Sequence, residues 1–152
     1  MQFFYQLLNN EILLASFFGW LIAQILKTFI YVAVNKSFNP ERLLGDGGMP
    51  SSHSATVMAL VTATGLNFGA DTFQFAIAAV VALITMHDAM GVRRETGKQA
   101  VPINNIMEWF LQMGSDIAPE QKLKEFVGHT PLQVFFGALL GILVGFVVCA
   151  II

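Results

Sequence analysis

The stretch Gly47-Gly48-Met49-Pro50-Ser51-Ser52-His53-Ser54-Ala55 joins a polar connection to the apolar run 55–68. Glycine permits tight turns, proline is favoured in the first turn of a helix, and serine is common at a helix start. A helix that begins here would direct its unpaired N–H groups and the positive end of its dipole toward the surroundings of His53, which suits a phosphate. Alternatively, this is an ordinary capped helix whose histidine lies at a membrane boundary, and the stretch alone leaves both interpretations open.

The composition places the chain in a membrane. Of its 152 residues, 55% are hydrophobic and only 12% are charged, and the mean hydropathy is +0.65. Soluble domains are typically about a quarter charged. The net charge of −2 argues against a nucleic-acid partner, because such proteins present a basic surface. The single cysteine, Cys149, excludes an internal disulfide.

The hydropathy pattern predicts one all-α membrane domain, residues 1–152, built as a bundle of about four transmembrane helices. About 20 apolar residues are needed to cross a bilayer, and the expected spans are 12–34, 52–68, 73–90 and 131–152. Residues 1–8 suit a short interfacial helix. Residues 91–130 form a polar cap between the third and fourth spans, in which short helices are expected over 103–113 and 119–126.

The basic residues predict how the helices are oriented. All of them lie at or between spans one and two, or between spans three and four, and these two connections share one side of a four-span bundle. They are Lys27, Lys36, Arg42, Arg93, Arg94, Lys98, Lys122 and Lys124. Because basic connections favour the cytoplasm, we expect both connections there and both termini outside. The host membrane would be a bacterial inner membrane or an organelle membrane.

A second histidine cluster, Gly128-His129-Thr130-Pro131, repeats the features of the first. On the expected topology His53 and His129 lie at the same membrane face, each at a helix start. Two histidines among several bases could perform phosphoryl transfer, one attacking phosphorus and the other protonating the leaving oxygen. Each histidine alone could equally be an inert interfacial residue, and their shared face favours function. The bases available for the phosphate are Lys27, Arg42, Arg93, Arg94 and Lys124.

Three ordered blocks resemble the small divergent branch of the type-2 phosphatidic acid phosphatase and vanadium haloperoxidase superfamily. They are 48–55, which is similar to the Pro-Ser-Gly-His motif, then 88–104, and then 128–131 with Val134 and Gly137. The resemblance implies that His129 is the nucleophile and forms a phosphohistidine, and that His53 is the general acid. It also implies that Ser51 and Ser52 hold phosphate oxygens, supported by Gly47 and Gly48. No metal and no other cofactor would be required.

The chain also departs from the superfamily pattern. It has no clean match to the first motif, Lys-x6-Arg-Pro, and Lys27 with Arg42 is the expected substitute. Leu123 stands at the spacing where the superfamily has an arginine, so that the charge would come from Lys124, Arg93 or Arg94. Asp88 is expected to pair with Arg93 or Arg94 rather than to bind a metal with His87.

Gln133 stands where the superfamily places the aspartate that orients the nucleophilic histidine. Its oxygen can accept the same hydrogen bond but brings no negative charge. We therefore expect a membrane phosphatase that hydrolyses a lipid phosphate or a related phosphorylated amphiphile, with slow turnover. The alternatives are a lipid-phosphate binder or transporter without catalysis and a small structural membrane protein. The sequence is also compatible with a homo-oligomer.

Overall fold

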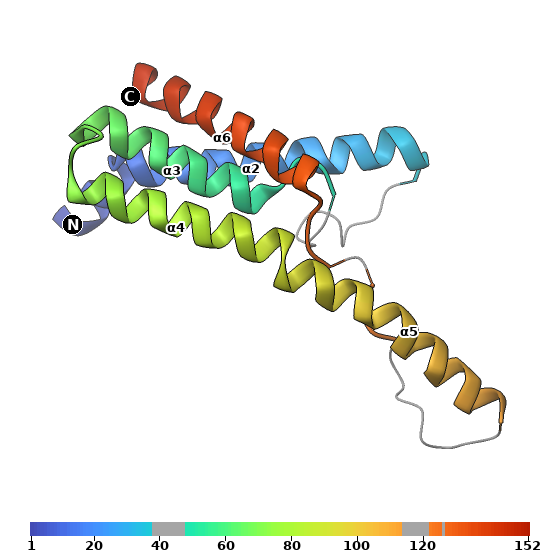
Figure 1. The fold of residues 1–152 in the computed structure, drawn as a ribbon. Coiled ribbons are helices and arrows are strands. Elements are labelled where there is room, and N and C mark those ends of the chain that lie inside the picture. The colour runs from blue at the N-terminus through green and yellow to red at the C-terminus, as the bar shows by residue number, and fades with distance from the viewer. Residues whose placement is uncertain (38–47, 114–121, 126) are drawn as a thin grey trace.

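The computed structural model describes residues 1–37, 48–113, 122–125 and 127–152. Within these ranges all regular structure is α-helical, as the sequence predicts. The helices are α1 (Gln2–Leu8), α2 (Glu11–Asn35), α3 (Ser52–Phe68), α4 (Phe73–Met90), α5 (Val92–Gln112) and α6 (Pro131–Ile151). Figure 1 shows α2, α3, α4 and α6 side by side in one bundle, and α5 continuing from α4 beyond it. The contacts make α3 the central helix, because it packs against α2, α4 and α6.

Local capping explains where these helices begin. Asn10 accepts hydrogen bonds from the N–H groups of Ile12 and Leu13 at the start of α2. Ser51, Thr72 and Thr130 each accept one from the N–H group three residues later, at the starts of α3, α4 and α6. Such caps replace hydrogen bonds that the first turn of a helix lacks. The expected spans 12–34, 52–68, 73–90 and 131–152 agree with the helices within one residue at each end.

Close approach at glycines fixes α6 against α3. A Cβ atom placed on Gly137 would lie 2.4 Å from the carbonyl oxygen of Ser51, and one on Gly141 would lie 2.3 Å from that of Ala55. Gly145 follows at the same spacing and packs against Thr62. Small residues at this spacing let membrane helices pack backbone to backbone. The two helices therefore run parallel, and their first turns, which carry the histidine motifs, lie beside each other.

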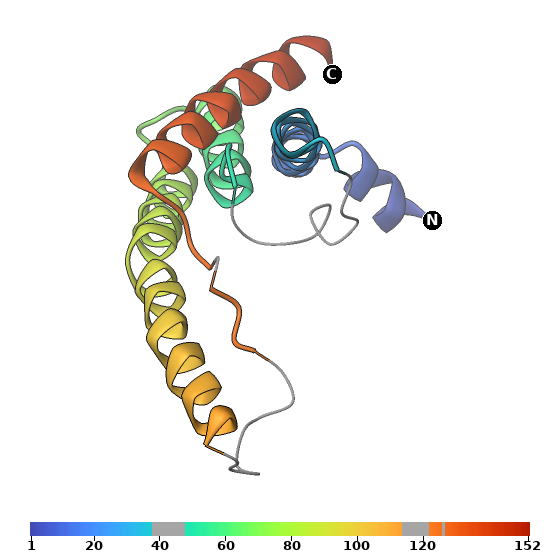
Figure 2. The same ribbon diagram turned by 90° about the vertical axis from the view of Figure 1, so that its right-hand side faces the viewer.

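Among the described residues, three helical stretches are long and apolar enough to cross a membrane: α2, the nearly continuous α4 and α5, and α6. With 17 residues, α3 is shorter than the roughly 20 residues that a bilayer core requires. It nevertheless lies in the centre of the bundle, as Figure 2 also shows, and is lined by buried small residues such as Ala55, Ala59 and Ala63. The crossing of the membrane by α3, and so the count of four spans, stays a prediction.

The prediction for the polar cap is wrong in two respects. The helix expected over 103–113 begins already at Val92, directly after Gly91, and runs unbroken to Gln112. The second helix, expected over 119–126, is absent from its described part, since Lys122–Glu125 is not helical. The side chain of Asn104 explains this difference, because it donates to the carbonyl of Leu123 and accepts from the N–H of Leu123, each at 2.9 Å. These bonds use backbone groups that a helix would need.

Candidate functional site

The two histidine motifs meet at one end of the bundle. His53 lies in the first turn of α3, and His129 directly precedes Thr130, the N-cap residue of α6. Their imidazole rings are in edge-to-face contact, with ring centroids 5.7 Å apart and planes inclined by 62°. The His129 ring is almost fully buried, with 2% of the residue exposed. The two histidines therefore lie beside each other, as the sequence predicts.

The backbone around His129 is fixed by the junction of α4 and α5. The N–H of His129 donates to the carbonyl oxygen of Ala89 at 2.9 Å. The preceding Gly128 has φ +82°, a conformation that side-chain-bearing residues rarely adopt. A Cβ atom at Gly128 would also lie 2.4 Å from the backbone nitrogen of Arg94. Only glycine fits here, and its fit brings His129 against the first turn of α5.

Gln133 orients the His129 ring. The Gln133 side-chain oxygen Oε1 accepts a hydrogen bond from the backbone N–H of Thr130 at 3.0 Å, completing a capping box with the Thr130 hydroxyl. Because a backbone N–H can only donate, it is the amide oxygen that faces inward. The Nδ1 atom of His129 lies 3.3 Å from this oxygen. In a neutral ring Nδ1 must then carry the proton, which leaves the lone pair on Nε2.

The predicted serines belong to the same end of the bundle. The Ser51 hydroxyl is fully buried and accepts hydrogen bonds from the backbone N–H and the hydroxyl of Ser54, at 3.3 and 3.1 Å. The N–H of Ser51 donates to the carbonyl of Gln133 at 3.0 Å. Ser51 thus ties α3 to α6, and its N–H is used within the fold. Ser52, the first residue of α3, is also buried. Direct contact of either serine with a phosphate stays a prediction.

A cavity of about 280 Å³ lies beside His129, the candidate nucleophile. It is lined among others by His129, Gln133, Gly48, Arg94 and Lys98. His53 contacts the ring of His129 and does not line this cavity. Arg94 and Lys98 bring two cations to this lining from one face of α5, where they lie one turn apart. The lining also contains Glu125, and Lys98 pairs with Glu95 at 2.6 Å. Lys98 was missing from the predicted phosphate ligands, although its spacing of four residues from Arg94 is the signal that could have identified it.

The other predicted cations are distributed differently. Arg93 points away to Asp88, with 2.7 Å between Arg93 Nε and Asp88 Oδ2, which confirms the predicted pairing for Arg93. Lys124 is exposed and does not line the cavity. Lys27 is 3% exposed, and its side-chain carbons pack against Gly48. Arg42 and Gly47 lie outside the described residues.

Glu125 and Val127 line one side of the cavity, and their backbone packs on α5. A Cβ atom at Gly97 would lie 2.7 Å from the carbonyl oxygens of both Glu125 and Val127, so the close packing requires glycine. Asn104 donates to the Glu125 carboxylate at 2.8 Å. Farther out, Lys122 pairs with Glu108, and this hydrogen bond raises the pKa of Lys122 above its ordinary value. Asn104 thus organises this side of the cavity, and no local sequence pattern predicts this role.

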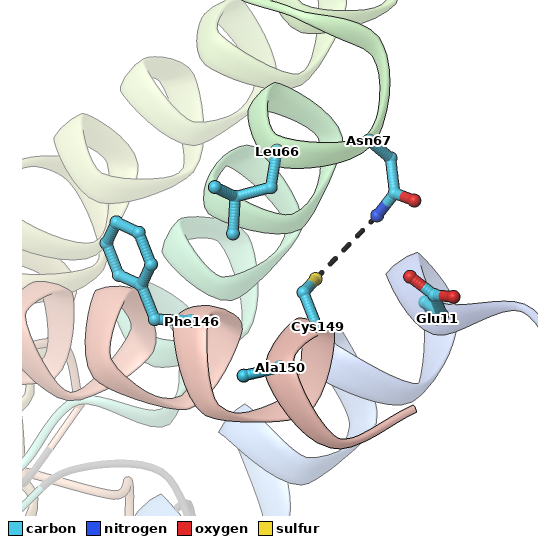
Figure 3. Close-up of a pocket in the computed structure, with 6 residues that line it drawn as sticks. All are labelled: Glu11, Leu66, Asn67, Phe146, Cys149 and Ala150. Carbon is cyan, nitrogen blue, oxygen red and sulfur yellow. Dashed lines mark hydrogen bonds between the residues drawn. The ribbon is translucent and has the colours of Figure 1, made fainter.

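No group of three histidine, cysteine, aspartate or glutamate side chains within the described ranges is arranged to hold a metal ion. His87, the remaining histidine, is exposed on α4. A second cavity, of about 270 Å³, lies at the opposite end of the bundle and is shown in Figure 3. There Asn67 of α3 donates to the sulfur of Cys149 of α6 at 3.7 Å, with Glu11 of α2 in the same lining. This lining holds an acid and no base, so it does not suit an anion.

Comparison with known proteins places the chain among relatives. Residues 8–144 match the model of a family described as "Divergent PAP2 family". The chain is 42% identical over 147 residues to the "Uncharacterized membrane protein YuiD" of Bacillus subtilis (strain 168), a match that covers 91% of this chain and 93% of that protein. No solved structure matches. The membrane-protein relative and the apolar helices together support an all-α membrane protein.

Proposed function

The chain belongs to the divergent PAP2 family, and from this premise we propose that it is a membrane phosphatase. Its substrate would be a lipid phosphate or a related phosphorylated amphiphile, whose head reaches the cavity while its tail stays in the membrane. The observation that supports this most is the contact between His53 and His129, with ring centroids 5.7 Å apart, beside a cavity that Arg94 and Lys98 line. Arrangements of this kind combine a nucleophile, an acid and electrostatic stabilisation.

In the first step Nε2 of His129 attacks phosphorus. The N–P bond forms as the ester P–O bond breaks, and the electron pair of that bond goes to the leaving oxygen. Protonated His53 gives its proton to this oxygen, so that the alcohol leaves neutral. In the second step water attacks the phosphohistidine and His53 takes the proton of the water. The N–P bond breaks, phosphate is released, and both histidines return to their starting states.

The charges around the cavity suit this reaction. Arg94 and Lys98 line it and would stabilise the oxygens of the phosphoryl group in flight. The N-terminus of α3 adds the positive end of a helix dipole. Lys27 of α2 packs against Gly48, which also lines the cavity. On the predicted topology this end of the bundle faces the cytoplasm, because the basic connections are there.

A lipid-phosphate binder or transporter is the second candidate. The observation in its favour is Gln133, whose amide oxygen orients the imidazole without the negative charge that would stabilise an imidazolium. In serine proteases the corresponding change from aspartate to an amide lowers the rate about 10⁴-fold. A site with this residue could hold a phosphate and turn over slowly or not at all.

Phosphate release by the purified protein in lipid nanodiscs separates the candidates. The protein is tested on a panel of lipid phosphates beside the variants His129→Ala and His53→Ala, with His87→Ala, an exposed histidine, as the matched control. Release that both site variants abolish and the control keeps supports the phosphatase. Tight binding of a lipid phosphate without release of phosphate supports the binder. If the protein neither binds lipid phosphates nor releases phosphate, only a structural role in the membrane is left.

A further inference from the structure

The buried residues of α2 change character along the length of this helix. Its first half buries the small residues Ala15, Gly19 and Ala23, which permit close packing. Its second half buries three polar residues instead: Gln24, Lys27 and Thr28 are 7%, 3% and 9% exposed. Polar side chains inside a membrane-spanning helix are costly and mark functional positions. Lys27 already belongs to the predicted phosphate site, but Gln24 has no role in it.

The packing register places Gln24 beside the start of α3. Gly19 lies against Ala55, since a Cβ atom there would be 2.8 Å from the Ala55 carbonyl oxygen. Farther along α2, Lys27 lies against Gly48. The two helices are therefore antiparallel, and the two contacts are about 12 Å apart along α2. Gln24 falls between them, at the level of the first turn of α3, which carries His53.

The side-chain amide of Gln24 is buried with an unused acceptor. Its Oε1 atom is inaccessible to solvent and has no hydrogen-bond partner among the residues that the structure describes. The nearest hydroxyl along the helix, that of Thr28, donates to the backbone carbonyl of Gln24 at 2.9 Å and not to the amide. A buried acceptor without a donor destabilises the fold. Such an atom is explained if a ligand supplies the donor.

We propose that Gln24 is a ligand-binding residue of the phosphate site. Its amide oxygen accepts a hydrogen bond from an O–H of the bound phosphate, that is, from the protonated oxygen of a phosphate monoanion. The amide N–H₂ group can donate to an unprotonated oxygen of the same phosphate. A neutral amide suits this position, whereas a carboxylate would repel the anion. The inference rests on the anion site of the proposed function but not on hydrolysis.

The test compares Gln24→Met with the wild-type protein in phosphatidylcholine nanodiscs, using inorganic phosphate as the probe and calorimetry for the Kd. Methionine has nearly the same shape and no hydrogen-bonding amide. We expect the Tm of the ligand-free variant to be unchanged or higher, because an unpartnered amide is lost. We expect phosphate binding to weaken at least tenfold. Gln24→Glu should weaken it further above pH 7, where both the side chain and the phosphate are negative.

Gln74→Met, in the first turn of α4 at the opposite end of the bundle, is the matched control and should leave both measurements unchanged. A lower Tm for ligand-free Gln24→Met would show that the Gln24 amide stabilises the fold. A Kd for phosphate equal to that of the wild type would show that the amide does not contact phosphate. Either result overturns the inference, as does a wild-type protein that binds no phosphate. If the protein binds phosphate but releases none from lipid phosphates, the phosphatase proposal is wrong, whereas the proposed role of Gln24 in phosphate binding still holds.

Discussion

The side-chain oxygen of Gln133 lies 3.3 Å from Nδ1 of His129 and 3.0 Å from the backbone nitrogen of Thr130, which donates to it. One amide oxygen therefore caps α6 and orients the imidazole that we propose as the nucleophile. This links the start of a helix, a local feature of the sequence, to the orientation of the His129 ring. We therefore expect substitutions at residue 133 to act directly on the proposed nucleophile.

Replacing Gln133 with aspartate should raise phosphate release at least about tenfold. A carboxylate can accept hydrogen bonds from His129 and from the N–H of Thr130, and it also stabilises the positive charge that develops on His129 as the phosphohistidine forms. Initial rates on the best lipid phosphate measure the effect, with Gln99→Asp on the exposed part of α5 as control. A Gln133→Asp variant no faster than the wild type would contradict the role given to this residue.

Arg94 and Arg93 should differ sharply although they are neighbours in sequence. Arg94 lines the cavity, whereas Arg93 is paired with Asp88 in a half-exposed ion pair. We expect Arg94→Gln to lower kcat/KM about 10²-fold, which is typical when a preorganised charge or donor is removed from a transition state. Arg93→Gln should lower it less than about fivefold, since exposed ion pairs contribute little. Equal losses in the two variants would show that the cavity is not where the phosphate binds.

Gly128→Ala should destabilise the protein by at least about 2 kcal/mol. The residue has φ +82°, and a Cβ atom would lie 2.4 Å from the Arg94 nitrogen, so that strain and a backbone clash add together. Thermal unfolding in detergent measures the change. Gly65→Ala provides the comparison, because Gly65 lies inside α3 and its Cβ would meet only the Phe75 ring, at 3.1 and 3.2 Å. Similar losses at the two glycines would refute this account of the His129 loop.

The features of the fold that were predicted correctly follow from local sequence, whereas the feature that was predicted wrongly depends on a contact between distant residues. The helix starts at Asn10, Ser51, Thr72 and Thr130 could be predicted because cap and apolar run are adjacent along the chain. The helix expected over 119–126 is absent from its described part, 122–125, because Asn104, distant in sequence, binds the backbone of Leu123. No local pattern contains that contact.

The candidate site was predictable to a similar extent. The meeting of His53 and His129 follows from a topology that puts both helix starts at one end of the bundle, together with the family resemblance. The choice between Arg93 and Arg94 could not be made from sequence, because it depends on the direction in which each side chain leaves α5. Lys98, by contrast, could have been identified from its spacing of four residues from Arg94, which puts both side chains on one face of α5.

The predicted topology can be tested by cysteine labelling in a Cys149→Ser background. Asp71 precedes α4 at one end of the bundle, and Lys98 lies on α5 beyond the other end. With a membrane-impermeant maleimide on intact bacterial cells, Asp71→Cys should be labelled at once and Lys98→Cys only after lysis. The reverse pattern would put the site outside the cytoplasm, and labelling of both positions in intact cells would contradict a membrane crossing between them.

The central claim is that His129 carries the phosphoryl group, and a trapped intermediate tests it most directly. Wild-type protein is mixed with a ³²P-labelled lipid phosphate, quenched in alkali, where phosphohistidine survives, and mapped by mass spectrometry. We expect label on His129 in the wild type and none in His129→Ala. Release of phosphate without any label on His129, or unchanged release by His129→Ala, would contradict the account.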